Sequence, residues 1–195
     1  MTFCEELPES VEYRGRVYRM RTAFDSVLCA LRALDDAELT PCERRDIALE
    51  YLVCGRFPRC DGLLNEVLSA LCLLPDSKSK QSGPKTLDLY IDTPYIYAAF
   101  MQAYGIDLYE ERGRMHWLKF HALLSSIPQN TRLADIMRIR SEDIPPPNRH
   151  NAKQREAMIR AKMHYKLPVS EAEGRNSFEN AFRGLISAFK ERGEI

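Results

Sequence analysis

Two histidines, His116 and His121, are the side chains in this sequence best suited to chemistry. Imidazole titrates near neutral pH and binds metal ions, so it can act as an acid, a base or a ligand. On a helix, two residues five positions apart point about 140° away from each other, so this pair cannot chelate one ion as an i, i+4 pair can. We therefore expect no metal site here, and we expect His121 to be a core or boundary residue beside Trp117.

The six cysteines are a second candidate group for chemistry, at positions 4, 29, 42, 54, 60 and 72. They form no Cys-x-x-Cys pair, and no histidine lies in this part of the chain, so a structural zinc site is disfavoured. We expect free thiols, because we find no export signal, and we expect Cys29, Cys54 and Cys72 to serve as small apolar residues in helices.

No catalytic motif accompanies these residues. The sequence lacks a phosphate-binding glycine loop, a nucleophile elbow and a zinc-protease helix. The carboxylates Asp107, Glu110 and Glu111 lie close to Arg112 and Arg114, as in a solvated turn of mixed charge. We therefore predict a protein that is not an enzyme and that needs no cofactor.

The charges also limit the classes of partner. Lysine plus arginine equals aspartate plus glutamate at 28 each, so no global field attracts nucleic acid or an anionic membrane. No apolar run approaches the ~18–20 residues that span a bilayer. A hydrophobic fraction of 45% is typical of a globular protein, and protein partners are the remaining expectation.

Hydrophobic periodicity predicts a short hairpin followed by helices. Residues 11–20 alternate apolar and charged side chains around Gly15, which indicates two strands and a turn. From Phe24 the period changes to about 3.6, and a stripe of Phe24, Val27, Leu28, Leu31 and Leu34 predicts the first helix. Thr40, Pro41 and Glu43 form a capping box that begins a second helix ending at Gly55, with Tyr51 among its inward residues.

Further helices follow the same reasoning. Asp61 is expected to cap a third helix, and residues 87–91 are expected to be extended. Thr93 and Pro94 begin a helix that Gly105 ends, residues 115–126 form the next, and Asn130 or Thr131 caps a short one. The predicted structural core consists of Phe100, Tyr104, Trp117, Phe120 and Leu124.

Three prolines, Pro145 to Pro147, mark the predicted domain boundary, because such a run forms a stiff, non-helical spacer. Residues 1–144 are predicted to be a helical core domain with the hairpin and a mobile loop at 75–86. Residues 145–195 would form the spacer, a basic helix at 149–166 and a C-terminal amphipathic helix. The overall prediction is a mainly α, bundle-like fold with a helical arm.

The candidate partner-binding residues are the last apolar stripe, namely Phe178, Phe182, Leu185, Ile186 and Phe189.

Several segments resemble the bacteriophage gene-product-fifteen family of tailed phages and prophages. They are residues 89–92 (Leu-Tyr-Ile-Asp), 95–100 (Tyr-Ile-Tyr-Ala-Ala-Phe), 104–108, 115–120 (Met-His-Trp-Leu-Lys-Phe) and 136–141, with a similar start at 7–11. The resemblance covers roughly residues 5–166; the Ser/Lys loop and residues 170–195 depart from it.

The resemblance implies a role in tail assembly and transfers no catalytic residue. Genes of this family typically lie between those of the major tail protein and the tape measure, where long-tailed phages encode tail assembly chaperones. The implied function is a chaperone or adaptor that binds phage tail proteins, the tape measure or the tail tube, in the cytoplasm of the bacterial host. A structural component of the virion is the alternative, a DNA-binding regulator through residues 149–166 is the second, and a homo-oligomer stays open.

Overall fold

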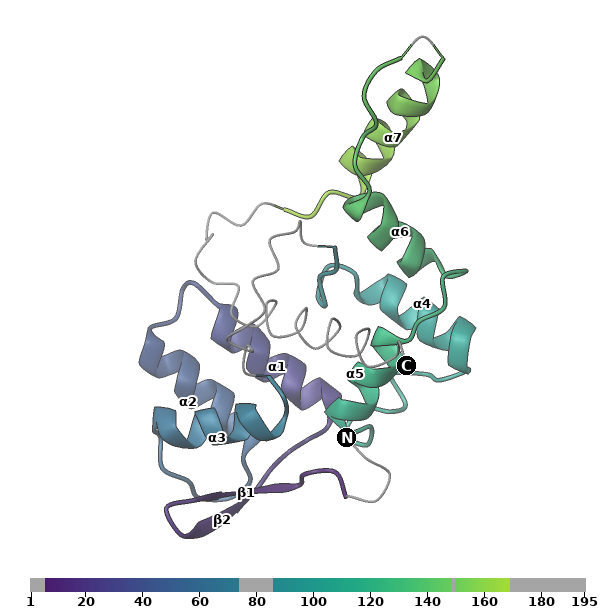
Figure 1. The fold of residues 1–195 in the computed structure, drawn as a ribbon. Coiled ribbons are helices and arrows are strands. Elements are labelled where there is room, and N and C mark those ends of the chain that lie inside the picture. Colours follow the sequence, from purple (N-terminus) through teal and green to yellow (C-terminus); the bar gives the residue numbers. More distant parts are fainter. Residues whose placement is uncertain (1–5, 74–85, 149, 169–195) are drawn as a thin grey trace, which may run out of the picture. The chain divides into compact units, whose positions relative to one another are not determined.

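The fold is mainly α-helical with an N-terminal β-hairpin, as predicted. The computed structural model describes residues 6–73, 86–148 and 150–168, and within them it has seven helices and one two-stranded antiparallel sheet (Figure 1). These residues form two compact units. The first unit combines residues 6–73 with 109–125, and the second combines 86–108 with 126–148 and 150–168.

The hairpin begins the first unit. Strands β1 (Ser10–Tyr13) and β2 (Arg16–Arg19) pair with Val11 opposite Tyr18. The turn residues Arg14 and Gly15 both have positive φ, 51° and 73°, which a two-residue hairpin turn of this twist requires. After β2, Met20 bridges Val53, so the hairpin is tied to the chain that leaves the second helix.

Helices α1 (Phe24–Asp35) and α2 (Pro41–Leu52) pack against each other. The predicted capping box of α2 is present, because the Thr40 Oγ accepts a hydrogen bond from the Glu43 N–H at 3.3 Å and the Glu43 carboxylate accepts the Thr40 N–H at 2.8 Å. Helix α2 ends at Leu52 and not at Gly55, because Val53 leaves the helix for its bridge to Met20.

Two details of the apolar faces differ from the sequence prediction. On α1 the buried residues centre on Phe24, Val27, Ala30, Leu31 and Ala33. Leu28 and Leu34 of the predicted stripe are only half-buried. On α2 the prediction for Tyr51 is wrong: Tyr51 is exposed, and Leu49, about 160° around the helix from it, is buried instead.

Helices α3 (Asp61–Ala70) and α5 (Trp117–Ser125) complete the first unit. The N-cap of α3 is Cys60, so the prediction of Asp61 as cap is off by one residue. Helix α5 packs on α1, with the rings of Phe24 and Phe120 stacked at 4.8 Å between centroids. The backbone N–H of Trp117 donates a hydrogen bond to the Thr22 carbonyl at 2.6 Å. A helix from a later part of the chain thus belongs to the core built by the N-terminal residues.

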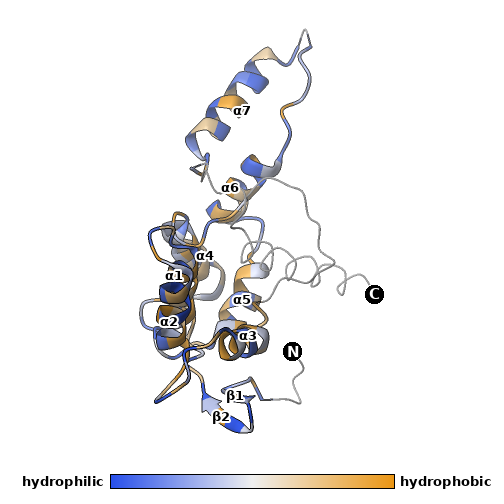
Figure 2. Cartoon of the chain, turned by 90° about the vertical axis from the view of Figure 1, so that its left-hand side faces the viewer, coloured by the Kyte–Doolittle hydropathy of each residue, from blue (hydrophilic) through white to orange (hydrophobic). Residues whose placement is uncertain are grey.

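The second unit contains α4 (Thr93–Tyr104), α6 (Arg132–Ser141) and α7 (Ala152–His164). As predicted, Gly105 ends α4 with a left-handed φ of 64°, and Thr131 caps α6 by accepting the Ala134 N–H at 3.3 Å. Helix α6 packs on α4 and also contacts α7, which extends away from α4 in both views (Figures 1 and 2).

Three segment predictions have different outcomes. Residues 87–91 do not form a strand, and residues 89–92 form a turn before α4. The predicted mobile loop at 75–86, apart from Thr86, lies outside the described residues. The predicted domain boundary at residues 144 and 145 stays a prediction. No helix in the described ranges is long and apolar enough to cross a membrane.

Candidate functional site

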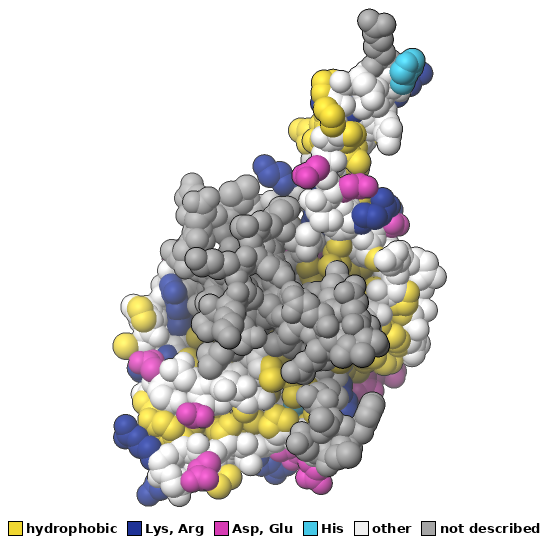
Figure 3. All heavy atoms as spheres, viewed as in Figure 1, with side chains coloured by type: hydrophobic (Ala, Val, Ile, Leu, Met, Phe, Trp, Pro, Cys, Tyr) yellow, Lys and Arg dark blue, Asp and Glu magenta, His cyan; other side chains and the backbone are white. Residues whose placement is uncertain are grey.

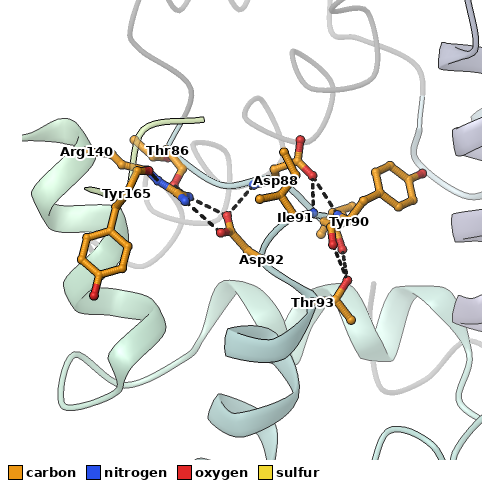
Figure 4. Close-up of polar contacts among 9 residues, drawn as sticks. Thr86, Asp88, Tyr90, Ile91, Asp92, Thr93, Arg140 and Tyr165 are labelled. Atoms are coloured by element: carbon orange, nitrogen blue, oxygen red, sulfur yellow. Dashed lines mark hydrogen bonds and ion pairs between the residues drawn. The ribbon is translucent and has the colours of Figure 1, made fainter. Parts of the chain in front are cut away.

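A buried ion pair lies at the centre of the second unit. Arg140, in the last turn of α6, holds Asp92, the residue before α4, through two hydrogen bonds of 2.5 and 2.8 Å (Figure 4). The Asp92 side chain is 0% exposed and the Arg140 side chain 7%. Two parallel N–H donors on two carboxylate oxygens form the strongest geometry available to such a pair.

The remaining donors and acceptors of this pair are also used. The Asp92 carboxylate accepts the Asp88 N–H at 2.9 Å. Arg140 donates to the carbonyl oxygens of Thr86 at 2.9 Å and of Tyr165 at 2.7 Å. Burying a charge is costly unless it is paired and hydrogen-bonded, and both conditions hold here. We call this set the Asp92–Arg140 centre; it joins the chain before α4, the end of α6 and the residue after α7.

The turn before α4 is built around Asp88. Its carboxylate accepts the N–H groups of Tyr90 and Ile91, each at 2.8 Å, and the Thr93 hydroxyl donates to the carbonyls of Leu89 at 2.9 Å and Tyr90 at 2.8 Å (Figure 4). An aspartate that bonds the backbone two and three residues ahead favours a turn over a strand. This local bonding explains why residues 87–91 do not form a strand.

Tyr165 attaches the end of α7 to the rest of the unit. Its ring packs edge-on against Tyr95, with 6.4 Å between centroids, and the Arg132 guanidinium lies over it at 5.3 Å. Arg132 also donates a hydrogen bond to the Tyr165 hydroxyl. The backbone carbonyl of Tyr165 accepts a hydrogen bond from Arg140. Tyr165 therefore contributes a ring, a hydroxyl and a carbonyl to one attachment point.

Helix α7 is otherwise held by polar contacts. Arg155 donates to the Pro145 carbonyl, Asn151 to the Pro146 carbonyl at 2.9 Å, and Lys162 to the Arg140 carbonyl at 3.1 Å. None of the thirteen residues of α7 is buried. Figure 2 shows hydrophilic and hydrophobic residues mixed along this helix.

The two histidines are part of the first unit's structure. The His116 Nδ1 accepts the Leu118 N–H at 3.1 Å, so its Nε2 carries the proton and donates to the Pro8 carbonyl at 3.2 Å. Burial lowers the pKa of His116, and it lowers the pKa of His121 to about 4. Both rings are buried, and His121 lies 6.0 Å from Trp117 between ring centroids, on the core side of α5 as expected.

The cysteines of the described residues are free thiols, as expected, but their predicted positions were partly wrong. Cys29 and Cys72 are exposed, whereas the sequence suggested that they serve as small apolar residues in helices. Cys54 is half-buried, but it and Cys72 follow α2 and α3 and lie in no helix. Cys60 is the distinctive one, because the backbone N–H of Leu63 at the start of α3 lowers the pKa of its thiol and the Tyr13 hydroxyl acts in the same direction. Across the described parts of the chain, no three histidine, cysteine or acidic side chains gather as metal ligands.

The residues predicted as core or partner-binding have the following positions. Phe100, Trp117, Phe120 and Leu124 are buried. Tyr104 is only half-buried, with its ring edge-on to Phe100 at 5.7 Å between centroids. The candidate partner-binding stripe, Phe178, Phe182, Leu185, Ile186 and Phe189, lies outside the described residues.

Comparison with known families matches residues 3–167 to the bacteriophage Gp15 protein family. The chain belongs to this family. No curated protein and no solved structure matches it significantly.

The segments that suggested the Gp15 family contain both residues of the buried ion pair. Asp92 ends the Leu-Tyr-Ile-Asp segment, and Arg140 lies near the end of the segment 136–141. Sequence reasoning treated both segments as packing signatures and did not pair the two charges, which are 48 residues apart. Two aspartates, Asp88 and Asp92, precede α4 and two arginines, Arg138 and Arg140, lie in the last turn of α6, but periodicity does not say which of these charges meet.

Proposed function

We propose that this Gp15-family protein is a non-enzymatic tail assembly protein, a chaperone or adaptor that binds the tape-measure chain in the cytoplasm of the infected bacterium. The observation that carries the proposal is the family match over residues 3–167. Genes of this family typically lie where long-tailed phages encode tail assembly chaperones. Such a protein would keep a long helical chain soluble until tube subunits assemble around it.

Apolar residues at helical spacing, in the sequence and on α7, give the proposal support of a general kind. Binding proteins for amphipathic helices offer apolar side chains at helical spacing. In this chain the predicted stripe at Phe178 to Phe189 has that spacing, and α7 offers exposed apolar residues within the described part. Neither feature identifies the tape measure, so the partner has to be tested directly.

Co-expression with the tape-measure protein of the same phage tests the proposal. We expect more soluble tape-measure protein and a complex that survives size-exclusion chromatography. A Phe182→Ser/Phe189→Ser variant should lose the complex, whereas Val17→Ser, which removes an exposed apolar residue of the hairpin, should keep it. Unchanged solubility together with no complex would refute the chaperone function.

Mass spectrometry of purified particles separates the chaperone from a structural tail protein. A chaperone should be absent from the finished virion, or present far below one copy per tail. Stoichiometric copies would instead identify a structural component and overturn the proposal in this form.

A further inference from the structure

Helix α7 is longer than its contacts explain. A helix of about 12–15 residues is only marginally stable alone in water, and in folded proteins it is stabilised mainly by burying one face. Helix α7 has 13 residues and buries none of them. The least exposed residues of α7 are only half-buried; they are Arg155, Met158, Ala161 and Lys162.

One flank of α7, about 90° around the helix from Arg155, Met158 and Lys162, carries an exposed apolar stripe. Ala152, Ile159 and Met163 are separated by seven and four residues, so they lie within about 40° of one another around the helix. Ile159 is 37% exposed and Met163 is 74% exposed. Single exposed apolar residues are ordinary on a protein surface, but here they are aligned on a helix that lacks a buried face.

Basic residues flank this stripe. Residues 150–168 contain five basic side chains, Lys153, Arg155, Arg160, Lys162 and Lys166, and one acidic side chain, Glu156, in a chain whose total charge is zero. Arg160 pairs with Glu156 across one turn, at exposed positions. Figure 3 shows hydrophobic and basic side chains together in the region of α7. Because the charge around α7 is positive, a complementary partner would be acidic.

We propose that the exposed side of α7, formed by the apolar stripe of Ala152, Ile159 and Met163 with Lys153 and Arg160 beside it, is a docking surface for an acidic amphipathic helix of another protein. The partner would place apolar side chains on the stripe and carboxylates against the basic flank, as flanking charges do in helix pairs. A second copy of α7 would bring like charges together, which disfavours this helix as its own partner.

Two other basic-helix ligands fit less well. Duplex DNA is bound through phosphate contacts, and an apolar stripe in the middle of the contact face would contribute none. A helix that lies on a membrane surface usually buries large residues such as Trp, Phe or Leu, and this stripe consists of Ala, Ile and Met. The proposed function does not specify this surface of α7, and the surface would bind any partner with this apolar and acidic pattern.

The test uses the full chain and a designed probe. The probe is a fluorescent peptide of about three heptads, with leucine and isoleucine on one face and glutamate on both flanks; its controls are the same peptide scrambled and a version with lysine for glutamate. We expect saturable binding of the acidic probe, measured by fluorescence anisotropy, that weakens as salt is added. Neither control peptide should bind.

Variants locate the binding on α7. Ile159→Ser/Met163→Ser should weaken binding of the probe about 10-fold or more, because both substitutions remove apolar contacts with it. Lys153→Gln/Arg160→Gln should weaken binding by a similar factor at low salt and reduce its salt dependence. The matched control is Val17→Ser in β2, whose side chain is 72% exposed against 74% for Met163, and it should bind the probe as the unaltered chain does.

Three results would overturn the proposal. The first is that the acidic probe shows no saturable binding, and the second is that the scrambled or basic peptide binds equally well. The third is that Val17→Ser weakens binding as much as the α7 variants do. Duplex DNA or anionic vesicles that bind the chain, and that lose binding with Lys153→Gln/Arg160→Gln but not with Ile159→Ser/Met163→Ser, would replace the peptide partner by a phosphate surface. A tape-measure complex without probe binding would leave the proposed function intact and refute this surface.

Discussion

The Asp92–Arg140 pair is the side-chain interaction whose loss should cost the second unit most. Replacing Arg140 by alanine would leave the Asp92 carboxylate buried without its cation, and removing one partner of a buried pair typically costs about 3–5 kcal/mol. We expect Arg140→Ala to lower the free energy of unfolding by an amount in this range, measured by urea denaturation with circular dichroism.

The matched control for Arg140 lies two residues away on α6. Arg138 pairs with Asp135 and Glu142 at exposed positions, so Arg138→Ala should have little effect. Asp92→Leu/Arg140→Met, which removes both charges together, should recover much of the stability lost in Arg140→Ala. Equal losses in Arg138→Ala and Arg140→Ala would contradict this account of the pair.

His121 should make stability depend on pH. Its pKa is about 4 in the fold because of burial, and about 6.5 in an unfolded chain. Between these values the unfolded chain binds a proton and the folded chain does not, so stability falls as pH falls from about 6.5 to 4, by about 3 kcal/mol in total. His116 contributes in the same direction, because burial also lowers its pKa.

The measurement is the urea midpoint across this pH range. The His121→Gln variant should show a clearly flatter pH dependence than the unaltered chain. His164, which is exposed on α7, provides the control, and His164→Gln should leave the slope unchanged. A pH dependence as steep in His121→Gln as in the unaltered chain would contradict this role of His121.

At the scale of elements, Gly62 determines how the hairpin packs on α3. A Cβ added there would lie 2.4 Å from the Tyr13 hydroxyl and 2.9 Å from its ring. Alanine usually stabilises a helix relative to glycine by up to about 1 kcal/mol, yet here we expect Gly62→Ala to lower thermal stability, because the Tyr13 ring must move. In a Tyr13→Ala background the same substitution should raise stability. A stabilising Gly62→Ala in the unaltered chain would refute this contact.

Local sequence signals identified most elements, and their limits were also local. The Thr40 capping box, the Gly15 turn and the Gly105 C-cap are encoded within a few residues, and all three are present as predicted. The end of α2 was wrong because a distant residue, Met20, takes Val53 into a bridge. The segment 87–91 was wrong because the Asp88 side chain competes for backbone N–H groups that a strand would use.

At the scale of the whole molecule, sequence order does not predict which elements share a core. Helix α5 belongs with α1 in the first unit, although α4 of the second unit lies between them in the chain. The apolar periodicity of α5 showed which of its faces is buried, with Trp117 and Phe120 on it. It did not show which other helix that face packs against. For the same reason, the Asp92–Arg140 centre could not be derived, because its partners come from three separate segments.

This interrupted order predicts how fragments behave. A fragment of residues 1–104 contains α1 to α4 but lacks α5. Phe24 would lose its stacking partner Phe120, and the Thr22 carbonyl would lose the backbone N–H of Trp117. We expect this fragment to show no cooperative thermal transition by circular dichroism. A fragment of residues 1–144 keeps α5 and should retain such a transition, with the single tryptophan protected from iodide quenching because Trp117 is 1% exposed in the fold. Cooperative unfolding of residues 1–104 with the midpoint of the full chain would show that α5 is dispensable, and would contradict the assignment of residues 109–125 to the first unit.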